Sequence, residues 1–77
     1  MEETTDIGLS VTLLCKGYYL EEIRLIGSRC HFLFSSTSDL GQVAHDYWNG
    51  KILVEPKRYQ SELKNLKTRM FAVQNNG

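Results

Sequence analysis

Two apolar segments of strand-forming residues, separated by a glycine turn, constrain the fold of this chain more than any other feature. Residues 18–26 and 30–34 are rich in aromatic and branched apolar residues, and Gly27-Ser28 lies between them. Gly-Ser suits a two-residue hairpin turn, because glycine adopts a positive φ without a steric cost. The sequence therefore predicts a β-hairpin over residues 18–35.

The position of the turn fixes the register of this hairpin. Ile26 is expected to face Arg29, and the pairing continues to Glu21 opposite Phe34. Because side chains alternate between the two faces of a strand, one face collects the apolar residues and is expected to face the core. That core face holds Ile23, Leu25, Cys30, Phe32 and Phe34. The opposite face is mixed and holds Leu20, Glu22, Arg24, Ile26, Arg29, His31 and Leu33.

A helix is predicted before the hairpin. Thr5 or Asp6 can cap it, and it runs to about Lys16. Its apolar residues form two stripes on nearly opposite sides, and the second stripe consists of Leu9 and Leu13. A helix of this kind is either sandwiched between other elements or offers one side to another chain.

Two more helices are predicted after the hairpin. Apolar residues in 39–48 recur at intervals of three and four, which is typical of an amphipathic helix. A last helix is expected over residues 56–73, because proline is favoured at the first helical position and Pro56 stands there. The short apolar segment 52–54 fits either a third strand or an extended connector.

These elements predict one small α+β domain, in which a helix and a β-hairpin are followed by two helices packed on one face of the sheet. The folded part is expected to span residues 5–73, with flexible tails at residues 1–4 and 74–77. No apolar run approaches the roughly 18 residues of a membrane span, and the acidic start is unlike a secretory signal. We therefore expect a cytoplasmic protein that does not bind a membrane.

The net charge is zero, but the two parts of the chain carry opposite charge. Residues 1–50 hold seven acidic and three basic residues, whereas residues 51–77 hold two acidic and six basic ones. This asymmetry fits either an anionic partner or two parts that attract each other. Five bases of the last helix are candidate nucleic-acid contacts: Lys57, Arg58, Lys64, Lys67 and Arg69. They spread over about half of the helix circumference, which favours a solvated exterior over a nucleic-acid site.

The sequence carries no recognisable catalytic or metal-binding pattern. The candidate ligands are Cys15, Cys30, His31 and His45, and no pair of them has the spacing of a zinc site. Cys30 and His31 are neighbours in a strand and should point to opposite faces, and a buried thiol is inert. We therefore expect no enzymatic activity, no cofactor and no metal.

Several landmarks stand out together. They are Thr5-Asp6 at the start of the first helix, Lys16-Gly17-Tyr18 at its end, Cys30-His31-Phe32-Leu33-Phe34 in the hairpin, Tyr47-Trp48-Asn49-Gly50, and Leu63-Lys64-x-Leu66-Lys67 in the last helix. Over about residues 5–71 this pattern resembles a family of short prokaryotic and viral domains of unknown function. The resemblance implies a compact one-domain protein from a mobile or viral genome, and it transfers no activity and no catalytic residue.

Three features predict self-association. The mixed hairpin face keeps Leu20, Ile26 and Leu33, the first helix has its second stripe of Leu9 and Leu13, and a small sheet has open edges. The expected function is therefore a non-enzymatic module that binds another protein and forms a homodimer, such as a viral or mobile-element inhibitor or adaptor. The alternative is a DNA- or RNA-binding module that uses the last helix.

Overall fold

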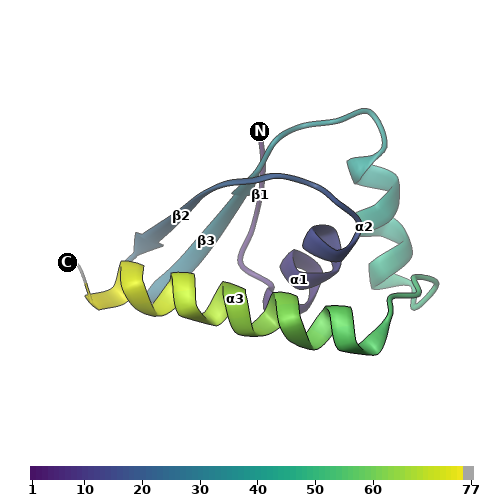
Figure 1. The fold of residues 1–77 in the computed structure, drawn as a ribbon. Coiled ribbons are helices and arrows are strands. Elements are labelled where there is room, and N and C mark those ends of the chain that lie inside the picture. The colour runs from purple at the N-terminus through teal and green to yellow at the C-terminus, as the bar shows by residue number, and fades with distance from the viewer. Residues whose placement is uncertain (76–77) are drawn as a thin grey trace.

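The computed structural model describes residues 1–75, which form three strands and three helices (Figure 1). The strands are β1 (Glu2–Thr4), β2 (Leu20–Ile26) and β3 (Arg29–Phe34). The helices are α1 (Ile7–Cys15), α2 (Leu40–Trp48) and α3 (Pro56–Asn75). The sheet is antiparallel in the order β1-β3-β2, α1 and α3 lie on one side of it, and α2 packs against α1. The predicted α+β class is confirmed.

The hairpin register is confirmed from the turn as far as Glu22 opposite Leu33, with Gly27 at a φ of 64° in the turn. The last predicted pair is wrong, because Phe34 faces Leu20 instead of Glu21. A β-bulge at this point adds one residue to β2 and resets the alternation of its side chains. Leu20 therefore joins the core and is 4% exposed, whereas the sequence placed it on the mixed face.

The N-terminal residues form a strand, so the prediction of a flexible tail at residues 1–4 is wrong. β1 pairs with β3, with Glu3 opposite Leu33. β3 is thus the central strand, and Leu33 lies between Glu3 and Glu22 on the outer face of the sheet. Because neighbours flank it on both sides, Leu33 is only 5% exposed.

The third strand comes from the N-terminus, and residues 52–54 are part of the connector between α2 and α3. The Lys16 ammonium donates a hydrogen bond to the carbonyl of Leu53 at 2.7 Å, which ties this connector to the end of α1. The C-terminal tail was expected to begin at residue 74, but α3 continues through Asn75. Residues 76–77 of that tail lie outside the described part of the chain.

α1 lies at the centre of the core. Asp6 caps it as predicted, since its carboxylate accepts a hydrogen bond from the amide of Leu9 at 2.7 Å. Leu9 and Leu13 are both buried, so the helix is sandwiched. The buried apolar cluster consists of Leu9, Val11, Leu13, Leu20, Cys30, Phe32, Phe34, Leu40 and Leu66.

Tyr47 fixes α2 against the first turn of α1. Its hydroxyl donates to the capping Asp6 carboxylate at 3.1 Å, the same oxygen that accepts from Leu9. Gly8 allows this approach, because a Cβ at that position would lie 2.3 Å from the Tyr47 hydroxyl oxygen. Burial raises the pKa of the Tyr47 phenol, and the nearby Asp6 raises it further. The neighbouring Trp48 packs edge-on against the Tyr47 ring and is 62% exposed.

Gly8→Ala should destabilise the fold by about 1–3 kcal/mol, because the added methyl group displaces Tyr47 from its place against α1. Gly41→Ala is the matched control in α2, where an added Cβ has nothing within 4 Å. It should stabilise the protein by about 0.5–1 kcal/mol, as alanine does in an exposed helix. Urea unfolding measures the change in the free energy of unfolding in both variants. Equal changes would contradict the conclusion that Gly8 is needed for the approach of Tyr47.

Tyr47→Phe should lower the free energy of unfolding by about 0.5–1.5 kcal/mol, because it removes one partly buried hydrogen bond. The variant should also respond differently to alkali. The pKa of Tyr47 is raised in the folded state, so the protonated phenol contributes to the free energy of unfolding. This contribution is complete below the usual tyrosine pKa of about 10 and is lost as the pH rises above it. Unfolding curves at neutral and alkaline pH should show a smaller loss of stability in the variant. An unchanged dependence on pH would contradict this.

Candidate binding surfaces

The basic residues of α3 are all on the surface. Lys57, Arg58, Lys64, Lys67 and Arg69, the predicted nucleic-acid contacts, are exposed, and none of them forms an ion pair with a residue in 1–75. The opposite side of the helix packs on the core through the fully buried Leu66 and the partly buried Tyr59, Leu63 and Met70.

The five bases lie on two flanks of α3. At about 100° per residue, Lys57, Lys64 and Lys67 fall on one flank, and Arg58 and Arg69 fall on the other. The structure therefore brings together three of the predicted contacts and separates the two arginines from them.

The lysine flank also carries a shallow, mainly apolar groove of about 470 Å³, called here the α3 groove. Its aromatic side chain is Phe71, which is 67% exposed. Phe71 was not among the residues predicted from the sequence, although the sequence holds one signal for it: Phe71 follows Met70 and so falls outside the core-facing stripe of the helix. The groove is lined by Gln60, Leu63, Lys64, Lys67, Thr68 and Phe71.

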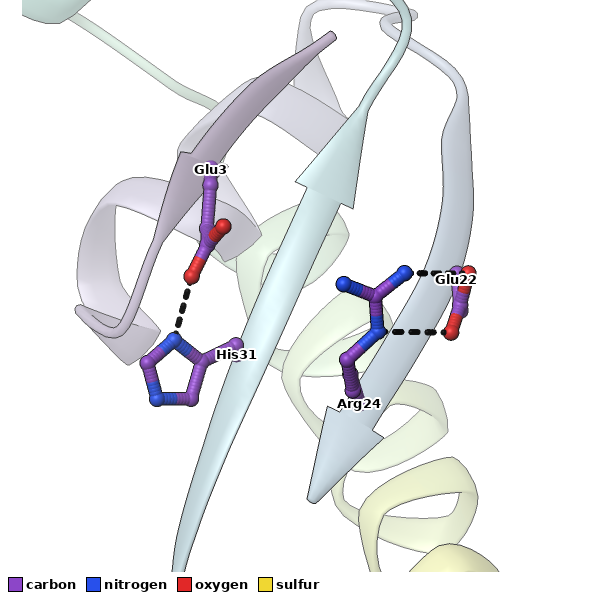
Figure 2. A network of polar contacts seen from close by, with 4 residues as sticks. All are labelled: Glu3, Glu22, Arg24 and His31. Atoms are coloured by element: carbon purple, nitrogen blue, oxygen red, sulfur yellow. Dashed lines mark hydrogen bonds and ion pairs between the residues drawn. The ribbon is translucent and has the colours of Figure 1, made fainter. Parts of the chain in front are cut away.

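The outer face of the sheet is polar and carries paired charges. Figure 2 shows Glu3 on β1 with His31 on β3, and Glu22 with Arg24 on β2, all on the face turned away from the helices. The Arg24 guanidinium donates two hydrogen bonds to Glu22, at 3.1 and 3.2 Å. Both side chains of this pair are about half exposed, at 51% and 49%. The pair is therefore accessible to a partner.

The residues predicted to carry self-association are mostly unavailable for it. Leu9, Leu13, Leu20 and Leu33 are between 2% and 5% exposed, so the expectation that they are free to meet a second copy is wrong. α2 and the sheet cover the first two, the bulge turns Leu20 inward, and neighbouring strands flank Leu33. Of the five, Ile26 is on the surface, with 51% of its area exposed.

The side chains considered for metal or thiol chemistry lie apart. Cys30 is 5% exposed in the core, whereas His31 points to the outer face and His45 is exposed on α2. Within residues 1–75 no three His, Cys, Asp or Glu side chains are grouped so that they could hold a metal ion. Burial raises the pKa of the Cys15 thiol, and the charge of Glu62 raises it further.

No helix in the described part of the chain combines the length and the apolar character that crossing a bilayer requires.

Both cysteines should react slowly with Ellman's reagent at neutral pH. Cys30 is shielded by the core, and the raised pKa of Cys15 reduces its thiolate fraction. Unfolding in urea should release both thiols to react at the rate of a free cysteine. A thiol that reacts at that rate in the native protein would contradict the burial described here.

Comparison with known sequence families finds a match for this chain. The sequence model described as Domain of unknown function (DUF5659) matches residues 3–72. No curated protein and no solved structure matches the chain. The matched residues run from β1 into the last turns of α3 and include the landmarks between residues 5 and 71. The resemblance to a family of unknown function is confirmed, and the chain belongs to the DUF5659 family.

Proposed function

We propose that the protein is a non-enzymatic binding module that contacts an acidic, partly apolar segment of another protein through the α3 groove. The observation that carries this proposal is an exposed aromatic ring, Phe71, beside Lys64 and Lys67, two lysines that form no ion pair within residues 1–75. Protein interfaces combine aromatic anchors at the centre with charged groups at the rim. The groove offers both within two turns of one helix.

Charge decides which kind of partner fits. Lys64 and Lys67 lie one turn apart, and Phe71 lies one turn further along. A segment with carboxylates beside a large apolar side chain matches this order, and charge complementarity speeds its encounter with the groove. The cytoplasmic location and the inhibitor or adaptor role belong to the same proposal. Flanking genes of viral or mobile-element type would favour that origin, and housekeeping neighbours would count against it.

Self-association is also part of the proposed function. A chain of this length has a thin margin of stability, to which contact with a second copy adds. The surfaces left for this contact are the exposed Ile26 and the open edge of the sheet to which it belongs.

Nucleic-acid binding is the second candidate, favoured by the five exposed bases of α3 and by Phe71, on which a base can stack. Only three of those bases share a flank with Phe71, which makes the phosphate-binding track short. If nucleic acid binds, its affinity should fall steeply with salt, with a slope of about −0.7 per phosphate contacted on a single strand.

The test is the double variant Lys64→Glu/Lys67→Glu, with Arg58→Glu/Arg69→Glu as a control that changes the charge equally on the other flank. The probes are a labelled peptide of alternating Glu and Leu, its Ser-Leu counterpart, and a single-stranded oligothymidine. We expect the acidic peptide to bind best and the lysine variant to lose about tenfold or more in affinity, equivalent to about 1.4 kcal/mol. The arginine variant should retain binding.

Phe71→Ser should weaken the same peptide without lowering stability, because the ring is largely exposed. Tighter, strongly salt-dependent binding of the oligonucleotide would favour the second candidate. Equal losses in the two charge variants, or no binding of any probe, would contradict the α3 groove as the contact surface.

A further inference from the structure

β2 forms an open edge of the sheet. The strand order β1-β3-β2 gives β2 one partner among the described residues, so its other side presents backbone N–H and C=O groups that pair with no strand there. The bulge lies at the Leu20 end, and Glu22 to Ile26 remain regular. Such edges are templates for strand addition unless charge or distortion blocks them.

The charges on β2 are complementary to themselves when the strand is reversed. Its sequence is Leu-Glu-Glu-Ile-Arg-Leu-Ile, in which the acidic Glu22 directly precedes Ile23 and the basic Arg24 directly follows it. In an antiparallel pair, side chains directly opposite each other interact, and opposite charges stabilise the pair whereas like charges destabilise it. The charges of β2 therefore disfavour pairing with strands that place like charges opposite them, whereas a reversed second copy of β2 places opposite charges there.

Symmetry and charge together favour one register for this pairing. Two copies related by a two-fold axis and joined by antiparallel strands place one residue opposite itself. An axis at Glu22 or at Arg24 sets like charges against each other. An axis at Ile23 sets the two Ile23 side chains together and places each Glu22 opposite the Arg24 of the second copy.

We propose that β2 pairs with β2 of a second copy about Ile23, so that two three-stranded sheets join into one sheet of six strands. This inference deepens the self-association in the proposed function and uses a different surface from the α3 groove. In the single chain Arg24 binds Glu22 of its own strand, and both side chains are half exposed on the outer face of the sheet (Figure 2). The axis is perpendicular to the sheet, so the helices of both copies cover the same face.

The charge pattern provides a test by exchange. Glu22→Arg sets two arginines of one copy against those of the other, and Arg24→Glu does the same with glutamates. Sedimentation equilibrium from about 10 µM to about 1 mM should show the native chain dimerising and each single variant weakened at least tenfold. An equimolar mixture of the two single variants should form a heterodimer, and the double variant Glu22→Arg/Arg24→Glu should dimerise again.

Recovery in the mixture excludes misfolding as the cause of the loss, and circular dichroism of each single variant checks this directly. Lys64→Glu/Lys67→Glu should dimerise like the native chain, so the failure of one surface can be told from the failure of the other. A native chain that is monomeric at about 1 mM would overturn the proposal. Single variants that dimerise normally, or a mixture that stays monomeric, would overturn it as well.

Discussion

The fold depends on the packing of one face of β3 against α1 and α3. Phe32 and Phe34 are each 1% exposed, and they belong to one cluster with Leu13 and Leu66. Burying large apolar side chains of this kind supplies most of the stabilisation available to so small a domain. Because β3 is also the central strand, the same residues hold together the sheet and the helices.

Covering the sheet on one face leaves two kinds of free surface. The outer side of α3 keeps its bases, and no ion pair in the described part of the chain joins them to the acidic first part. The opposite charges of the two parts therefore remain at the surface, where they are available to partners. The outer face of the sheet pairs its charges locally, and that arrangement gives the β2 edge its self-complementary pattern.

The sequence predicted those parts of the fold that depend on local rules. The Gly27 turn set the register, Asp6 capped α1, and Pro56 opened α3, as expected. β1 was missed because two glutamates have little tendency to form strands, and this segment pairs only because β3 offers it an edge.

The features that were missed at the binding surfaces depend on exceptions to those rules. Strict alternation cannot anticipate the bulge that turns Leu20 inward. The two apolar stripes of α1 fitted either a helix sandwiched within the chain or one that offers a side to another chain. Only the position of α2 could decide between them. Phe71 is a single aromatic residue beside the core stripe, and its exposure depends on how α3 is rotated against α1.

Amide hydrogen exchange measured residue by residue tests most directly whether β3 is the buried centre of the molecule. Amides in residues 30–34 should be among the slowest to exchange, close to the rate set by global unfolding, whereas the connector at 51–54 should exchange quickly. If residues 30–34 exchanged as fast as that connector, β3 could not be the central strand, and the surfaces derived from its position would have to be abandoned.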